Sequence, residues 1–346
     1  MFLSRISSPV PLLVSALFAG YPQLASSVEV VEFCNMKHII SKLEPSPKRQ
    51  NLLISSHLKD KAVVYIGGFF NCSSDDFKDN ESLIEQINAD VPIYRICPDS
   101  KLAIQENADK ILARLAYYSD RHPQRKYLIF GQSKGGAETL QLSATHPSIF
   151  TIAGKLDHGF VVHRAIAVNS AIGGTTLADL ALNRDPILLE RWSEFKDRLG
   201  LTNNFFGKVL KWLLLDDLSA GFKSLTTSEA AVRNQQLKLQ LSFDSKSLLQ
   251  RKLLYVTSER SMQDDAEGSK DLPFYLKNLA KFMFEHGHQN DGLVFESNQR
   301  LEGIGTHYLS VKNAGHFSLA GSYDKPSCRK DFMRYLLLKL AMDADH

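Results

Sequence analysis

The chain has 346 residues, of which 44% are hydrophobic and 23% charged, a balance typical of a folded protein with a sizeable core. This composition excludes a disordered, collagen-like or multi-span membrane chain, and the length allows one large domain or two modest ones. The 41 Lys and Arg residues exceed the 38 Asp and Glu residues by a formal net charge of only +3, which argues against nucleic acid as the main partner.

The first 27 residues have the order of a secretory signal peptide. Arg5 supplies a positive charge, the apolar run Val10–Gly20 follows, and the small residues Ala25–Ser27 favour cleavage after Ser27. The apolar run is too short to cross the hydrocarbon of a bilayer comfortably as a helix. A buried N-terminal helix or an uncleaved anchor is the alternative. We therefore predict an exported protein, periplasmic or secreted, whose mature domain is residues 28–346.

The cysteine content fits the oxidising compartment that export implies. The four cysteines are Cys34, Cys72, Cys97 and Cys328. They allow one or two disulfides in three full pairings, among which the sequence does not choose, and buried free thiols are an equally good reading. No CxxC pair is present, so a thiolate metal site is not expected, and we predict no metal and no cofactor.

Strand-like and helix-like segments alternate after the signal. Short apolar runs predict strands at residues 62–66, 92–97, 126–130, 164–168, 252–257 and 306–311. Helical spacing of apolar residues predicts helices at residues 80–87, 108–118, 135–144 and 331–341. The run Glu44–Arg49 is expected to be a loop. Alternation of this kind predicts an α/β fold with a mostly parallel sheet covered by helices on both faces.

Residues 175–248 break this alternation, because they carry helical patterns and little strand signal. We predict a helical cap or lid inserted above the sheet, with no independent core of its own. Within it, Trp212–Leu215 is a candidate lipid-facing edge, although packing of the cap onto the core explains these residues better.

Gly131-Gln-Ser133-Lys-Gly135 fits the pattern G-x-S-x-G between a predicted strand and a predicted helix. This is the setting of a nucleophile elbow, where a tight turn exposes a serine hydroxyl and requires the two glycines. The helix N-terminus would direct partial positive charge at the serine oxygen. A serine hydroxyl is a poor nucleophile without a base, so the hypothesis requires a histidine and an orienting acid.

Asp291 and His316 supply that acid and base in the required order. Asp291 lies in a polar turn after the strand at 252–257, and His316 follows the last predicted strand. Asp291-Gly292 is also simply a good turn. The competing acids and histidines are Asp264, Asp265, His158, His163, His286 and His288. The last two histidines suggest a metal site only weakly, and a surface loop explains them better.

Acyl transfer also needs donors for the negative charge of a tetrahedral intermediate. We expect one from the backbone N–H of Lys134, directly after the nucleophile. The second is expected from Phe69, which follows Gly67-Gly68 at the end of an early strand. An ordinary Gly-Gly turn is the alternative for this segment.

With these residues in place, the chain resembles α/β-hydrolases of the secreted bacterial triacylglycerol lipase type. Residues 169–179 (NSAIGGTTLAD), 224–234 (SLTTSEAAVRN) and 289–294 (QNDGLV) are similar to three motifs of that family, and the similarity spans about residues 60–320. The resemblance implies a serine carboxylester hydrolase with an acyl-enzyme intermediate. Its substrate would be a small-molecule or lipid ester, with transient contact to lipid surfaces.

The chain also departs from the family pattern. The usual elbow GHSMGG is GQSKGG here, and the charged Lys134 predicts a more polar mouth than a triglyceride lipase would have. The family's calcium-binding Asp after the catalytic histidine is replaced by Phe317-Ser318-Leu319, so that calcium site is not expected. A phospholipase, thioesterase or acyltransferase would use the same triad. A catalytically silent fold that binds a lipid or a protein is the alternative from another class.

Overall fold

The structure is a computed structural model that describes residues 28–68, 77–183, 220–260, 289–316, 318–319 and 326–343. Several predicted features lie outside these ranges: the signal peptide at 1–27, residues 212–215, Phe69, Cys72, Phe317, Asp264, Asp265, His286 and His288.

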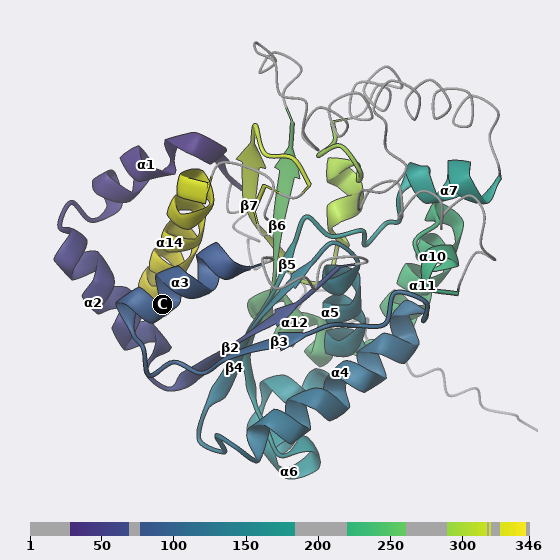
Figure 1. The fold of residues 1–346 in the computed structure, drawn as a ribbon. Coiled ribbons are helices and arrows are strands. Elements are labelled where there is room, and N and C mark those ends of the chain that lie inside the picture. The colour runs from purple at the N-terminus through teal and green to yellow at the C-terminus, as the bar shows by residue number, and fades with distance from the viewer. Residues whose placement is uncertain are drawn as a thin grey trace, which may run out of the picture.

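A seven-stranded sheet, parallel throughout, forms the centre of the fold (Figure 1). Its strands are β1 (Glu29–Glu32), β2 (Lys61–Ile66), β3 (Ile93–Ile96), β4 (Lys126–Gln132), β5 (Val162–Val168), β6 (Leu253–Glu259) and β7 (Thr306–Lys312). Their order across the sheet is β1-β7-β6-β5-β4-β2-β3. All six strands predicted from apolar runs are present, and the predicted α/β class is confirmed. β1 was not predicted.

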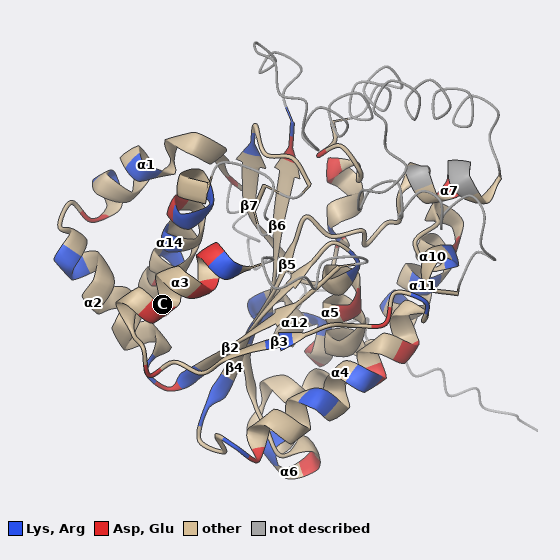
Figure 2. Ribbon diagram, viewed as in Figure 1, with Lys and Arg blue, Asp and Glu red and all other residues tan. Residues whose placement is uncertain are grey.

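Helices cover both faces of this sheet (Figure 1). One face carries α1 (Met36–Leu43), α2 (Pro47–Leu58), α3 (Lys78–Ile87) and α14 (Pro326–Met342). The other face carries α4 (Ile104–Ser119), α5 (Lys134–Thr145), α11 (Thr227–Gln240) and α12 (Phe243–Lys252). The short helix α6 (Ile152–His158) packs against the 3-10 helix Pro147–Phe150 that precedes it. Along β2 the side chains alternate between the two cores: Val63 and Tyr65 join the first, Val64 and Ile66 the second. Charged residues lie mostly on the helices and at strand ends (Figure 2).

The expected loop at Glu44–Arg49 is too long by three residues. Pro47 begins α2, and Ser46 caps this helix by accepting a hydrogen bond from the Arg49 N–H (3.4 Å). Proline fits the first position of a helix because the missing N–H has no intrahelical partner there. The proline that suggested a loop therefore marks the start of a helix.

The predicted insertion at 175–248 has described residues only at its two ends. α7 (Thr176–Leu182) begins it, and α10 (Ala220–Lys223), α11 and α12 follow after residues 184–219, which are not described. Leu237 of α11 and Leu249 of α12 are buried in the core shared with α4 and α5. The last part of the segment is therefore packed into a helical layer of the sheet.

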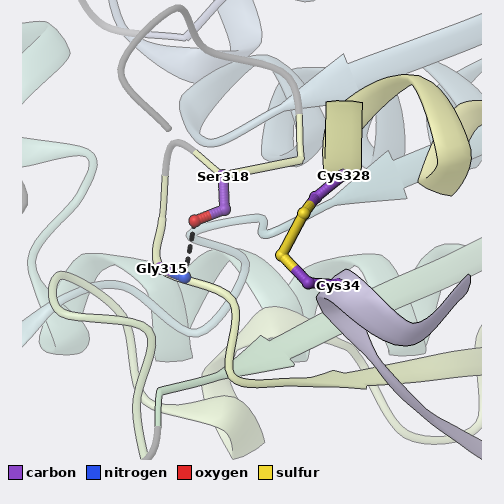
Figure 3. Close-up of a disulfide and its surroundings, with 4 residues drawn as sticks. All are labelled: Cys34, Gly315, Ser318 and Cys328. Atoms are coloured by element: carbon purple, nitrogen blue, oxygen red, sulfur yellow. Dashed lines mark hydrogen bonds between the residues drawn. A yellow bond between two sulfur atoms is a disulfide. The ribbon is translucent and has the colours of Figure 1, made fainter. Parts of the chain in front are cut away.

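A disulfide joins Cys34, in the short 3-10 helix Phe33–Asn35, to Cys328 in the first turn of α14 (Figure 3). The two residues are 294 positions apart in sequence. Cys97 is also disulfide-bonded. Among the residues that the structure describes, no cysteine is a free thiol, so the reading as buried thiols is wrong there. Across the described ranges, we find no helix with the length and apolar character needed to span a bilayer.

Candidate active site

Ser133 occupies a sharp turn between β4 and α5. Its backbone has φ 56° and ψ −124°, a conformation that a residue with a side chain adopts only under strain. A Cβ on Gly131 would lie 2.2 Å from Thr139 Oγ1, and a Cβ on Gly135 would lie 2.5 Å from the carbonyl oxygens of Ile66 and Gly67. Both positions therefore require glycine, which is the requirement that the sequence pattern implied.

The structure brings Ser133, His316 and Asp291 together. His316 Nε2 lies 2.8 Å from Ser133 Oγ, and His316 Nδ1 lies 2.8 Å from Asp291 Oδ2. His316 is 1% exposed and Asp291 is fully buried, whereas Ser133 is half-buried. Ser133 is thus the least buried residue of a hydrogen-bonded chain whose other two members are shielded from water.

The Asp291 carboxylate is oriented by its own turn. Its Oδ1 accepts hydrogen bonds from the backbone N–H groups of Leu293 (2.9 Å) and Val294 (2.8 Å). Its Oδ2 accepts from Gln299 Nε2 (3.3 Å) in addition to the imidazole. These donors fix the plane of the carboxylate. Gln299 was not predicted, because its place depends on the 3-10 helix Glu296–Gln299, for which the sequence has no periodic signal.

His316 lies in a loop after β7, and its backbone is held at both polar atoms. Its N–H donates to the Asp291 carbonyl (2.8 Å). Its carbonyl accepts from Gln132 Nε2 and from Asn169 Nδ2, each at 3.1 Å. A hydrogen bond from the Gly315 N–H to Ser318 Oγ (2.8 Å) closes the same turn (Figure 3).

The end of β2 approaches the nucleophile closely. A Cβ on Gly68 would lie 2.7 Å from Ser133 Cβ and 3.1 Å from its Oγ. The segment that leads into the predicted oxyanion loop is therefore in contact with the reactive serine. Lys134 is the first residue of α5, so its N–H lies in the first turn of that helix. Phe69, the other predicted donor, lies outside the described residues.

The expectation that Lys134 makes the mouth polar is wrong. Its side chain is 1% exposed, with Nζ 3.2 Å from Glu138 Oε1 and 2.7 Å from the Leu102 carbonyl. Asn107 Nδ2 also donates to Glu138 (2.6 Å). Burial lowers the pKa of Lys134 and raises the pKa of Glu138 to about 7. The i,i+4 spacing of Lys134 and Glu138 is the sequence signal for this pair.

Two of the family-like segments bind each other at the base of the insertion. Asp179 accepts hydrogen bonds from the N–H (2.9 Å) and Oγ1 (2.8 Å) of Thr227, at the start of α11. Arg233 and Asn234 both donate to the Ile172 carbonyl. These motif residues therefore have a structural role: they hold the segment after β5 against α11.

The competing histidines in the described part of the chain are remote from Ser133. His163 lies at the start of β5, whereas Ser133 follows the last residue of β4, at the opposite, carboxyl end of the parallel strands. Its ring is 5.5 Å from that of His57. Burial, and secondarily the charge of Lys61, lowers the pKa of His57 to about 4 and the pKa of His163 to about 3. His158 ends α6 at the same edge. Within the described ranges, no three His, Cys, Asp or Glu side chains are placed to hold a metal ion.

Comparison with known proteins identifies the fold. No protein-family model matches the sequence, and no curated protein matches it. The solved structure of Bacillus licheniformis lipase BlEst2 in its mature form is similar, with TM-score 0.55 and 18% identity over 82% of this chain and 92% of that chain. The propeptide form of the same lipase gives TM-score 0.50 and 20% identity, over 76% of this chain and 48% of that chain.

The parallel sheet, the strained elbow after β4 and these two likenesses define the class: the chain has the α/β-hydrolase fold. This confirms the fold predicted from the sequence.

Proposed function

We propose that the protein is an exported serine carboxylester hydrolase that acts through an acyl-enzyme on Ser133. The observation that carries the proposal is the continuous hydrogen-bonded chain from Ser133 Oγ through His316 to Asp291. The same spatial arrangement of nucleophile, base and acid performs acyl transfer on several unrelated folds, so geometry is the criterion by which such a site is recognised.

In the acylation step, Ser133 Oγ attacks the ester carbonyl while His316 Nε2 takes the hydroxyl proton. Asp291 keeps the proton on Nδ1, so that Nε2 is the basic nitrogen, and it stabilises the imidazolium that forms. When the intermediate collapses, Nε2 gives the proton to the departing alcohol and leaves an ester on Ser133. A water molecule then repeats the sequence and releases the carboxylic acid.

The negative charge on the former carbonyl oxygen needs donors that are already in place. We assign one to the Lys134 N–H, because this group begins α5 directly after the nucleophile. The second we assign to Phe69, which follows Gly68, the glycine in contact with Ser133. Donors at a helix start act without reorganisation during the reaction.

Two features support export and an ester substrate. The Cys34–Cys328 disulfide is typical of proteins that fold in an oxidising compartment, and it agrees with the signal-like first 27 residues. Lys134 is buried, so this residue places no charge at the opening of the site, which suits an uncharged ester better than the polar mouth first expected. A small-molecule or lipid ester is therefore the proposed substrate class.

Labelling with a fluorophosphonate tests the proposed nucleophile, because this reagent bonds only to an activated serine. We expect one adduct per chain by intact mass, mapped to Ser133 and lost in Ser133→Ala. Ser143→Ala is the matched control. Ser143 is a buried serine of α5, the helix that Ser133 precedes, and its Oγ donates to the Thr139 carbonyl of that helix (2.7 Å). An unlabelled wild-type protein would favour the silent binding fold.

A further inference from the structure

Two buried side-chain amides from different parts of the sheet converge on a single backbone carbonyl, that of His316. Gln132 is the last residue of β4 and Asn169 follows the last residue of β5. Each donates a hydrogen bond of 3.1 Å to the His316 oxygen, and Asn169 also reaches the Gly315 oxygen at 3.5 Å. Gln132 is 1% exposed and Asn169 is fully buried.

This convergence has a geometric consequence for the base. His316 stands in a loop, so neither a helix nor a strand fixes its backbone. A carbonyl oxygen has two lone pairs, and the two amides use both. Together with the N–H bond to the Asp291 carbonyl, they leave the peptide groups of His316 little freedom to rotate.

The two amides come from the segments that also hold the nucleophile. Gln132 directly precedes Ser133 in the chain. Next to Asn169, the Val168 carbonyl accepts from the Ser133 N–H (3.1 Å), and the Ala171 N–H donates to the Ser133 carbonyl (3.2 Å). The backbone of the base is therefore tied to the immediate surroundings of the serine that it must deprotonate.

The residue types fit this task. Asn169 has φ 47°, a left-handed conformation that asparagine tolerates better than most residues. Glutamine at 132 supplies an N–H donor on a side chain long enough to reach a neighbouring loop. Gln132 stands where the usual GHSMGG pattern has histidine, and its side-chain amide donates to the His316 carbonyl.

We propose that Gln132 and Asn169 are positioning residues, an amide clamp that sets the distance between His316 Nε2 and Ser133 Oγ. The clamp rests on the proposed function, and neither amide touches the reacting atoms. Its loss should displace the imidazole rather than unfold the protein, and a displacement near 1 Å lowers a rate about a hundredfold.

Gln132→Leu tests the clamp, because leucine keeps much of the side-chain volume and removes the donor. Gln141→Leu is the matched control: Gln141 is also buried, lies at the far end of α5 and bonds Gln105. Asn169→Gly is the second variant, since glycine accepts the left-handed backbone without the amide. We would measure kcat and KM with a p-nitrophenyl ester, the rate of fluorophosphonate labelling, and the low-field proton resonance of the His316 Nδ1–H bonded to Asp291.

The clamp predicts that Gln132→Leu and Asn169→Gly lower kcat and the labelling rate by about ten- to a hundredfold, with KM nearly unchanged and the imidazole resonance shifted or broadened. Gln141→Leu should match the wild type in all three measurements. If one clamp variant fails to fold, the other decides.

Clamp variants that label at the Gln141→Leu rate and keep the wild-type resonance would overturn the clamp. If the wild-type protein itself neither labels nor hydrolyses esters, the proposed function fails. The resonance then decides alone: a shift in the clamp variants supports the positioning of His316, and an unchanged line refutes it.

Discussion

Gly68→Ala places one methyl group against the reactive serine. The new Cβ would lie 2.7 Å from Ser133 Cβ, whereas two carbon atoms in contact are separated by about 3.5–4.0 Å. Either the end of β2 or Ser133 must therefore move by about 0.8 Å or more. Ser133 is held in a strained turn and by its hydrogen bond to His316, so movement on either side disturbs the site.

A misplacement of this size lowers kcat/KM about a hundredfold, which corresponds to about 3 kcal/mol of lost transition-state stabilisation. We also expect the free energy of unfolding to fall by about 1–3 kcal/mol, the usual cost of an overpacked site. The assay is p-nitrophenyl ester hydrolysis, with urea unfolding in parallel.

Gly159→Ala is the matched control for stability. Gly159 has φ 78°, and a Cβ there meets nothing within 4 Å. Alanine in that conformation costs about 1–2 kcal/mol of stability far from the site. The control should therefore lose stability and keep its kcat/KM. A folded Gly68→Ala protein with kcat/KM within twofold of Gly159→Ala would refute the reasoning.

Three further perturbations follow from the same structure. Asp291→Asn should lower kcat about ten-thousandfold with little change in KM, because the amide stabilises the wrong tautomer of its histidine partner; steady-state kinetics measures this, and a loss below tenfold would contradict it. Replacing Cys34 and Cys328 by alanine should lower the free energy of unfolding by up to about 6 kcal/mol, since the bond closes a loop of 294 residues; urea unfolding without reductant measures it, and a loss under about 1 kcal/mol would speak against it. His57 and His163 are buried with lowered pKa values of about 4 and 3, so the folded state binds fewer protons than the unfolded state. The free energy of unfolding should therefore be highest above pH 6.5 and should fall as the pH drops toward 4, by about 2–4 kcal/mol at pH 5. A free energy of unfolding that stays constant between pH 7.5 and 5 would contradict this prediction.

The sheet could be predicted because its strands are buried on both faces. Every residue of β2 is buried, and after Lys61 its residues 62–66 form an apolar run that is conspicuous in the sequence. β1 escaped prediction for the opposite reason. It is an edge strand of four residues, of which only Val31 is buried, and its pairing with β7 is a contact between distant parts of the chain.

The elbow could be predicted because steric rules act locally there. A G-x-S-x-G pattern between a strand and a helix specifies its own backbone, and the close contacts at Gly131 and Gly135 are its consequence. The direction of the Lys134 side chain depended instead on what α5 packs against. The carboxylate of Glu138 and the carbonyl of Leu102 turn it inward; the i,i+4 spacing signals the first of these partners, whereas Leu102 comes from a distant segment that the motif does not indicate.

The supporting residues of the site could not be predicted as such. Gln132 and Asn169 both stand in segments that the family resemblance singled out, yet their shared acceptor is a carbonyl more than 140 residues further along the chain. Only the fold brings the carboxyl ends of β4 and β5 together with the loop after β7. Gln299 reaches Asp291 in the same way, from a 3-10 helix without periodic signal.

Hydrolysis of p-nitrophenyl esters of increasing acyl length, by wild-type protein and Ser133→Ala, tests the central claim most directly. The proposed mechanism predicts turnover by the wild type on at least one chain length and its loss in the folded variant. The profile over chain length then separates an esterase from a lipase. Turnover that survives in Ser133→Ala, or its absence from both proteins at every chain length, would contradict a serine hydrolase at this site.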